Sequence, residues 1–113
     1  MKSFSRKAPV MGKEHYVRFA GVVGDFNAVH YDLEFAQKLK MPAVISQGPL
    51  TFSLALDAVA AEVGLDNVNA FKARISAPVF PDTELTIDCD EDGKVTASDG
   101  KTTYLQGTLG IKD

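Results

Sequence analysis

Apolar residues recur at two different periods along the chain, and the period changes near its middle. In the first half they follow one another at steps of three and four residues, which is typical of one face of a helix. This pattern predicts a helix that begins at Lys13 and ends at Gly24, and a short helix over 33–40 with Asp32 as its N-cap. The apolar positions of the first helix are Tyr16, Phe19, Ala20 and Val23.

A third and longer helix is predicted to follow the flexible Gly48, with Pro49 as its first helical residue, and to run to Val63. Pro49 suits its first turn, because the N–H that proline lacks would have no partner inside the helix there. The segment is apolar on almost every side, so we expect this helix to be buried and not to lie on a surface. Its small side chains would let a sheet approach closely; the alanines are Ala55, Ala58, Ala60 and Ala61.

In the second half apolar and polar residues alternate, as they do in half-buried strands. The predicted strands cover 71–77, 83–88, 94–97 and 102–111, with a further short strand over 2–8. The segments "DEDG" and "SDGK" between them are suited to hairpin turns. No repeat, linker or shift in composition divides the chain. We therefore expect one domain over 1–113 with an α+β fold, in which a curved antiparallel sheet wraps around one long central helix.

The composition narrows the range of partners. Of the 113 residues 45% are hydrophobic and 24% are charged, as in ordinary globular proteins, and the net charge is −3. This balance gives no electrostatic reason to expect nucleic acid or an anionic membrane as a partner. Cys89 is the single cysteine, which excludes a disulfide within the chain. With no signal-peptide pattern and no apolar run of membrane-spanning length, we expect a cytoplasmic protein.

Two segments resemble ligand-binding loops but have the wrong context. Residues 88–99 match most positions of an EF-hand calcium loop, yet strand-like segments flank them where an EF-hand has helices. The segment "DGKTT" resembles the end of a phosphate-binding loop, but Val95 stands where that loop requires a glycine. Both segments are interpreted as hairpin turns. His15 has no acid or cysteine at ligand spacing and is expected to be structural.

The stretch "GDFNAVHYD", residues 24–32, gathers two acids, an amide and an imidazole in a predicted turn. These side chains can serve the turn itself, since Asp25 and Asn27 can bond their own backbone and Asp32 can cap a helix. They can also serve chemistry, because Asp25 and His30 could converge on one water across the bend. A carboxylate can take a proton from that water, while an imidazole orients it and returns a proton.

Three segments in order resemble the MaoC-like, R-specific enoyl-CoA hydratase family. They are "AGVVGDFNAVHYDLEFA", similar to the family's Gly-Asp-x-Asn-Pro-x-His motif; "ISQGPLTFSLAL", similar to its glycine opening a long helix; and "RISAPVFPDTELTI", similar to its strand-loop-strand segment. The resemblance implies a hot-dog fold and a homodimer, or a heteromer with another hot-dog chain. It also implies syn addition of water to a trans-2-enoyl thioester, carried on CoA or acyl-carrier protein, or the reverse dehydration. No metal or other cofactor is implied.

Carried onto this sequence, the resemblance makes Asp25 and His30 the catalytic dyad, and the N–H of Gly48 the donor for the thioester oxygen. Substrate contacts are expected at Asn27, which could also brace the loop, and at Gln47 and Leu50. The sequence departs from the family at three positions: Ala28 replaces a proline, Gln47 a histidine and Pro49 a methionine. Two other functions stay open, an acyl-binding or half-competent subunit of a heteromeric dehydratase and an acyl thioesterase.

Overall fold

The computed structural model describes residues 1–112, which form one antiparallel sheet and three α-helices. The α-helices are α1 (Lys13–Val23), α2 (Leu33–Lys38) and α3 (Gly48–Val63), and the 3₁₀ turns are η1 (Ala28–His30) and η2 (Leu65–Asn67). The strands are β1 (Phe4–Lys7), β2 (Val68–Ile75), β3 (Thr86–Cys89), β4 (Lys94–Ser98) and β5 (Thr103–Ile111). The predicted order of elements is therefore confirmed. No helix among these residues is long and apolar enough to cross a membrane.

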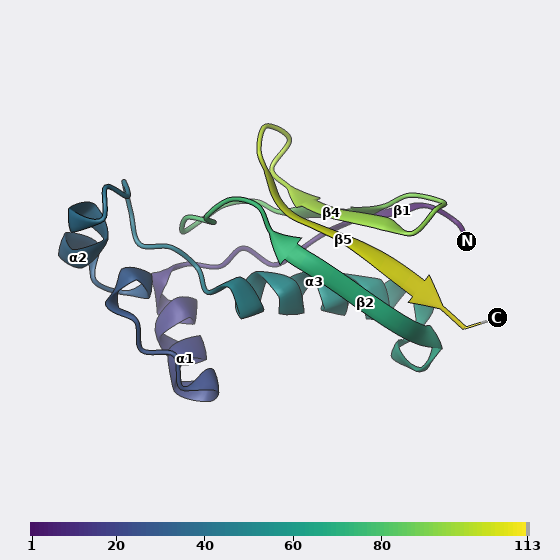
Figure 1. Ribbon diagram of the computed structural model, residues 1–113, viewed down its shortest axis with the longest axis horizontal. Coiled ribbons are helices and arrows are strands. Elements are labelled where there is room, and N and C mark those ends of the chain that lie inside the picture. The colour runs from purple at the N-terminus through teal and green to yellow at the C-terminus, as the bar shows by residue number, and fades with distance from the viewer. Residues whose placement is uncertain (113) are drawn as a thin grey trace.

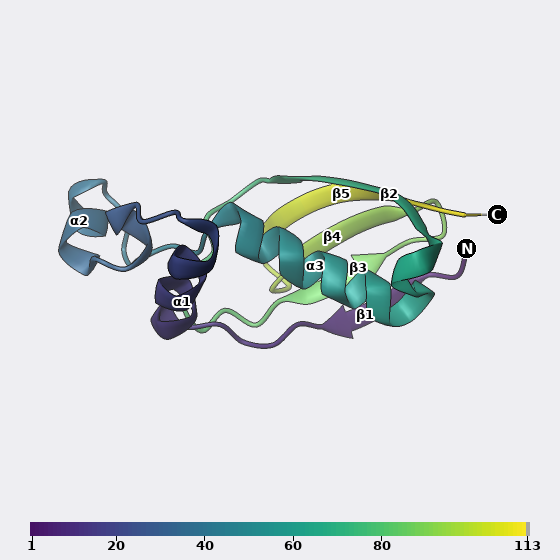
Figure 2. The same cartoon turned by 90° about the horizontal axis from the view of Figure 1, so that it is seen from below.

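The strands follow the order β1-β3-β4-β5-β2, and every neighbouring pair is antiparallel. The sheet curves around α3, which runs along its inner face (Figures 1 and 2). Gly107 on β5 stands opposite Ala73 on β2. A Cβ at Gly107 would lie 2.4 Å from the backbone oxygen of Lys72, so this close approach of two strands requires glycine. This architecture, a curved sheet around a long helix, is the hot-dog fold.

The two predicted hairpin turns connect β3 to β4 and β4 to β5. In each turn the side chain of one aspartate accepts hydrogen bonds from backbone N–H groups. Oδ1 of Asp90 accepts the N–H groups of Asp92 and Lys94, both at 2.9 Å. Oδ1 of Asp99 accepts the N–H groups of two residues of its own turn, at 2.9 and 2.8 Å. Gly93 has a φ of 86°, which glycine adopts without strain. The acidic segment 88–99 therefore forms strand and hairpin turns.

The core has two parts that meet along α3. One part lies between α3 and the sheet, and its buried members are Ala55, Ala58, Val59, Ile87, Cys89, Val95, Ala97, Leu105 and Leu109. The other part lies where α1, α2 and the loops meet the first turns of α3, and its members are Tyr16, Val29, Ala36, Val44, Leu50, Leu54, Val79, Leu85 and Tyr104. Two buried alanines on α3, as predicted, let the sheet lie close to the helix.

The prediction that α3 is buried on all sides is wrong for this chain. One side of the helix packs on the sheet, while Ser53 and Asp57 on the opposite side are exposed. Phe52 lies between these sides and packs its ring on Phe71 of β2, with 5.0 Å between the ring centroids. A single sheet has only one inner face, so it covers one side of a helix. The apolar residues elsewhere on α3 remain partly exposed.

All five strands differ from their predicted bounds, and β2 and β3 differ most. The strand predicted over 83–88 instead covers Thr86–Cys89, because it follows a turn at residues 81–82 and pairs only after residue 85. In that turn Asp82 has a φ of 65°, and the hydroxyl of Thr83 donates to the carbonyl of Phe80 at 2.7 Å. The strand predicted over 71–77 instead covers Val68–Ile75. Burial alternates along β3, whereas β2 has a register shift between Val68 and Ala70 and does not alternate throughout; the backbone pairing of each is set by the neighbouring strands.

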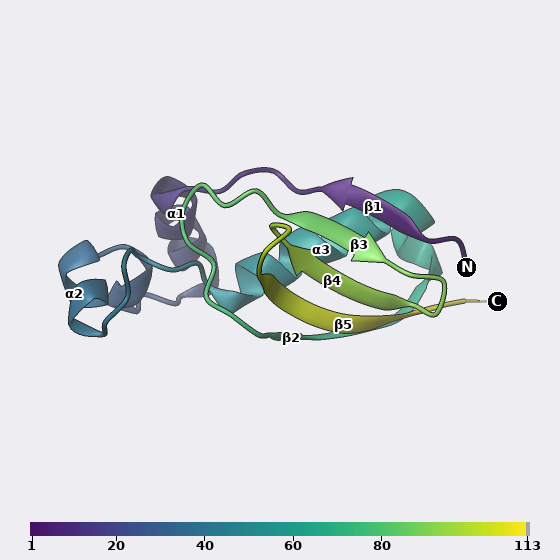
Figure 3. The ribbon, with the colours of Figure 1, turned by 90° about the horizontal axis from the view of Figure 1, so that it is seen from above.

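The helices α1 and α2 lie together beyond one end of the sheet, beside the first turns of α3 (Figures 1 and 3). His15 has the structural role that was expected, since its Nδ1 accepts the N–H of Gly12 at 2.9 Å where α1 begins. The loop that carries the Asp25–His30 motif connects these two helices. It is thereby brought to the N-terminus of α3, although Gly48 is 18 positions further along the sequence than His30.

Candidate active site

The loop between α1 and α2 is held by the side chains of its own polar residues. Gly24 ends α1 with a φ of 73°. Oδ1 of Asp25 then accepts the N–H of Asn27 at 3.2 Å, and Oδ1 of Asn27 accepts the N–H of Val29 at 3.1 Å. These two bonds start the 3₁₀ turn η1 and fix the direction in which His30 leaves the chain. After the turn, Asp32 caps α2 by accepting the N–H of a residue in its first turn at 3.2 Å.

The same loop brings the two candidate catalytic side chains together. Oδ2 of Asp25 lies 3.3 Å from Nε2 of His30. The imidazole side chain is only 10% exposed, whereas the carboxylate is 42% exposed. Asp25 therefore uses one oxygen for the turn and offers the other to the imidazole. The turn interpretation and the chemical interpretation of the motif are compatible, because the first provides the geometry that the second needs.

The other nitrogen of the imidazole is held by the backbone. Nδ1 of His30 lies 2.8 Å from the carbonyl oxygen of Ile45. A carbonyl can only accept a hydrogen bond, so we assign the hydrogen to Nδ1. In a neutral ring Nε2 then carries a lone pair and faces a carboxylate oxygen. That arrangement is suited to one shared proton, or to one water molecule that bonds both groups.

The N-terminus of α3 offers one backbone donor to this site. Pro49 has no N–H, and the N–H groups of Leu50 and Thr51 both donate to the carbonyl of Gln47, at 3.2 and 3.3 Å. Gly48 is the first residue of the helix, so its N–H has no partner within it. The positive end of the helix dipole lies at the same place. Gly48 is thus the residue of this turn that can bind an oxygen carrying negative charge.

A cleft of about 440 Å³ contains both His30 and Gly48. Most of the residues that form its walls are apolar, and they come from the segment before α3, from α3 itself and from the end of β2. They are Ile45, Ser46, Thr51, Ile75, Ser76, Ala77, Pro78 and Val79. Ligand-binding clefts are mostly apolar and carry a few polar groups that orient the ligand, and here the imidazole and the free backbone N–H are such groups.

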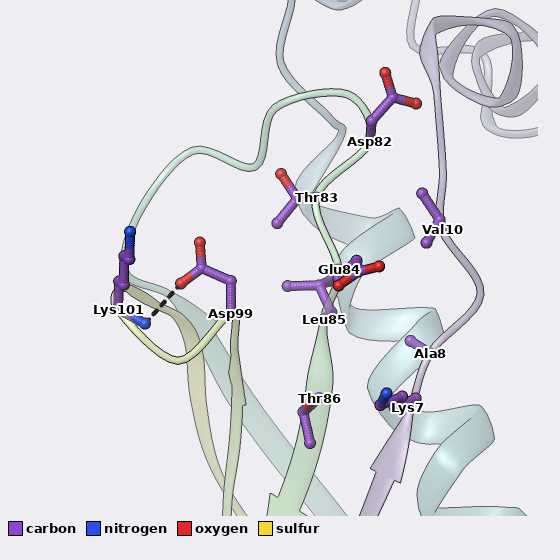
Figure 4. Close-up of a pocket in the computed structure, with 10 residues that line it drawn as sticks. All are labelled: Lys7, Ala8, Val10, Asp82, Thr83, Glu84, Leu85, Thr86, Asp99 and Lys101. Carbon is purple, nitrogen blue, oxygen red and sulfur yellow. Dashed lines mark hydrogen bonds between the residues drawn. The ribbon is translucent and has the colours of Figure 1, made fainter.

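A larger hollow of about 560 Å³ lies elsewhere, beside the turn that connects β4 and β5 (Figure 4). Charged residues of both signs line it, among them Lys7, Glu84 and Asp99. The carboxylate of Asp99 in this hollow already accepts two backbone N–H groups and the hydroxyl of Tyr104. These bonds hold the pKa of Asp99 at about 2, and the N–H of Thr102 contributes most. Because this carboxylate is already hydrogen-bonded within its own turn, we place the candidate active site in the smaller cleft.

Three residues that were predicted to contact the substrate make other contacts in the structure. The side chain of Asn27 caps η1, so it braces the loop, which was one of its two expected roles. Gln47 is fully buried, and its Nε2 donates to the carbonyl of Tyr16 at 2.7 Å; its side chain does not line the cleft. Leu50 is 8% exposed and packs in the core. Helical geometry explains both corrections, because neighbouring positions at a helix start point in different directions.

Sequence reasoning missed two contributions to the cleft. The carbonyl of Ile45 holds His30, but any residue has a carbonyl, so no pattern of side chains could have indicated it. Thr51 lies one turn into α3 and faces the cleft, whereas its place in an apolar run suggested only a core position. Its hydroxyl was a signal that could have been used, since a polar side chain inside such a run needs a partner.

The profile of the MaoC-like domain family matches residues 2–109. The (R)-hydratase from A. caviae involved in PHA biosynthesis is 21% identical with a TM-score of 0.77, over 98% of this chain and 93% of that one. The R-hydratase PhaJ1 from Pseudomonas aeruginosa is 20% identical, with a TM-score of 0.76 over 97% and 78%. A chain of the ChsH1–ChsH2 complex from Mycobacterium tuberculosis is 17% identical, with a TM-score of 0.76 over 99% and 93%. No curated protein matches. The family match spans almost the whole chain, which therefore belongs to the MaoC-like domain family.

Proposed function

We propose that this chain catalyses the reversible addition of water to a trans-2-enoyl thioester, which gives the R-3-hydroxyacyl thioester. The observation that carries the proposal is the 3.3 Å approach of Asp25 to His30 beside the free N–H of Gly48. His30 and Gly48 line the same cleft, and Asp25 lies beside the imidazole of His30. These are the groups that addition of water to a conjugated carbonyl requires.

In the forward direction Oδ2 of Asp25 and Nε2 of His30, 3.3 Å apart, both bond one water molecule that lies to the side of the pair. Its oxygen forms a bond to C3 of the enoyl group while its proton passes to the dyad, with Asp25 as the more exposed base. The π electrons of the C2–C3 double bond move onto the thioester oxygen and form an enolate. The dyad then returns the proton to C2, on the same face, and the enolate collapses. One water is added, and no electron is lost or gained.

Gly48 stabilises the charge that this step creates. Its N–H, at the positive end of α3, binds the thioester oxygen and binds it more tightly as the enolate forms. One such donor is typically worth about 3 kcal/mol of the barrier. Every transfer in the sequence is a proton transfer or a shift of an electron pair within the substrate. The proposed reaction therefore uses no metal and no redox cofactor, and the thioester is carried on CoA or acyl-carrier protein.

The experiment is hydration of crotonyl-CoA by the purified chain, with chiral analysis of the product. We expect loss of the enoyl absorbance and formation of the R product. The mass in solution is measured on the same sample, and we expect a homodimer. Release of free thiol without hydration would instead identify an acyl thioesterase. Formation of the S product, or a failure to hydrate any enoyl thioester, would contradict the proposal.

A second candidate is an acyl-binding or half-competent subunit of a heteromeric dehydratase. It is supported by the partly exposed apolar side of α3 and by β2, which forms one edge of the sheet in this chain. One of the solved structures with this fold is a complex of two different chains. In this case the isolated chain would be inactive on crotonyl-CoA, and activity would appear only after a second hot-dog chain is added.

A further inference from the structure

A tyrosine hydroxyl closes the loop that carries the candidate dyad. Oη of Tyr31 donates to the backbone carbonyl of Phe26 at 2.9 Å. Phe26 directly follows Asp25 in the sequence, and Tyr31 directly follows His30. The bond therefore joins the two residues that come after the members of the dyad, across five positions of the chain.

The second half of this loop is anchored to the protein core. Val29 and His30 are buried, and the backbone of Ile45 binds both of them. The carbonyl of Ile45 meets Nδ1 of His30 at 2.8 Å, and the N–H of Ile45 donates to the carbonyl of Val29 at 3.1 Å. The segment that precedes α3 thus fixes the position of the imidazole.

The first half of the loop is more exposed. Phe26 is 64% exposed and belongs to neither part of the core. The side-chain bonds that Asp25 and Asn27 make to the backbone of this loop span only two residues each. Bonds of so short a span shape the bend, whereas the bond from Tyr31 ties the exposed half to the anchored half.

We infer that Tyr31 is a positioning residue of this site, whose hydroxyl holds the exposed half of the loop so that the carboxylate of Asp25 stays beside His30. The inference rests on the proposed function and adds a residue on which that function depends. Tyr31 does not line the cleft, so it acts on the dyad and not on the ligand. Misplacement of a reacting group by about 1 Å can cost about 100-fold in rate, so a bond that helps to set the 3.3 Å between Asp25 and His30 affects catalysis.

Removal of the hydroxyl tests this role. Tyr31→Phe keeps the ring, and we expect kcat for crotonyl-CoA to fall about 5-fold, which corresponds to about 1 kcal/mol for one hydrogen bond. KM should stay within about 2-fold of the wild type, because only the reacting groups are misplaced. Amide hydrogen exchange reports the loop without any reaction. The N–H groups of Asn27 and Val29, which bond side chains of the loop, should exchange at least about 3-fold faster.

Proline at position 28 offers a rescue that does not use the hydroxyl. Asn27, which would precede it, has a φ of −60° and a ψ of 123°, in the extended region that residues before proline adopt. Ala28 is the first residue of η1, where a missing N–H breaks no bond of the turn. Because proline stiffens the loop, Tyr31→Phe should cost less than about 2-fold in kcat when Ala28→Pro is already present.

The matched control is Tyr104→Phe. It also removes a tyrosine hydroxyl that donates a hydrogen bond, at 2.8 Å to Asp99, but in the turn between β4 and β5. It should leave both kcat and the hydrogen exchange of the loop as in the wild type.

The outcomes separate this inference from the proposed function. Unchanged kcat and loop exchange in Tyr31→Phe would overturn it, as would an equal effect of Tyr104→Phe or a full loss of kcat in the presence of Ala28→Pro. A rise in KM at constant kcat would also overturn it, because Tyr31 would then act on the ligand. Faster exchange confined to the loop, in a protein that hydrates no enoyl thioester, would support the hold of Tyr31 on the loop and contradict the hydratase proposal.

Discussion

Nε2 of Gln47 lies 2.7 Å from the backbone oxygen of Tyr16, so the residue before α3 is bonded to the middle of α1. The interaction is fully buried. It joins the helix that leads into the Asp25–His30 loop to the helix that presents Gly48. This side-chain amide touches neither the dyad nor Gly48, yet together with the bonds between Ile45 and the loop it helps to set their relative position.

Replacing this amide should destabilise the fold. Gln47→Ala removes one buried hydrogen bond and leaves a small cavity, for which we expect a loss of about 2 kcal/mol in the free energy of unfolding. Urea denaturation measures it. The matched control is Gln37→Ala on α2, where the side chain is exposed and the change should stay within about 0.5 kcal/mol. Equal stability of the two variants would show that the bond to Tyr16 contributes little.

The dyad itself is tested by removing each of its groups. Asp25→Asn and His30→Ala should each lower kcat for crotonyl-CoA by at least about 100-fold, the range expected for general acid-base groups. Circular dichroism should show an unchanged fold. Asp66→Asn, at an exposed position of η2, serves as the control for a lost carboxylate and should keep its activity. Turnover near that of the wild type in either dyad variant would rule out the proposed roles.

Gly48 tests the backbone donor. A Cβ at this position would lie 3.3 Å from Cγ1 of Ile75, on the wall of the cleft. Gly48→Ala should therefore lower kcat/KM by about 10-fold or more while the fold stays intact, and the double variant with Ile75→Ala should recover part of the loss. Gly21→Ala is the control, because a Cβ there meets no atom within 4 Å. It should leave activity unchanged and add up to about 1 kcal/mol of stability.

Failure of the double variant to recover any activity would argue against crowding at Ile75 as the cause. Loss of activity in Gly21→Ala would show that the assay responds to helix stability in general. In both cases the role of the Gly48 N–H would need a different test, namely the affinity for a thioester analogue with a permanent oxyanion.

The turn at Asp99 gives a pH-dependent prediction. Three donors, the N–H of Thr102 first, then that of Lys101 and the hydroxyl of Tyr104, lower the pKa of this carboxylate from 3.8 to about 2 in the folded chain. The unfolded chain binds a proton first as the pH falls, so the stabilisation is present above pH 4 and is lost between pH 4 and pH 2. The stability difference between wild type and Asp99→Asn should vanish over that interval.

Thermal unfolding at several pH values measures this difference. Tyr104→Phe removes one of the three donors and should show a smaller change over the same interval. A difference between wild type and Asp99→Asn that is as large at pH 2 as at pH 6 would contradict the assignment. The turn is exposed, so the effect should also weaken as salt is added.

The elements of this fold could be predicted well from local patterns. The bounds of α1 agree with the prediction and α3 begins one residue before the predicted first helical residue, Pro49, because capping residues and proline act locally. The exposure of one side of α3 could not be predicted, because the hydrophobicity of the helix does not show which of its sides the sheet covers. Asp25 and His30 were predicted from their motif, and the structure brings their side chains to 3.3 Å from each other. The orientations of Gln47 and Leu50 depend on the helix phase at its first turn, which the sequence alone leaves open.

The backbone and the side chain of Ile45 have different roles in this site. Its carbonyl holds Nδ1 of His30 at 2.8 Å, and its own N–H donates to the carbonyl of Val29 at 3.1 Å, so the main chain on both sides is cross-linked. Its side chain meanwhile forms part of the cleft wall. Substitutions at position 45 can therefore reshape the ligand's surroundings while the imidazole keeps its tautomer. A different side chain at position 45 would change the shape of the cleft and leave the backbone bond that orients the ring of His30 in place.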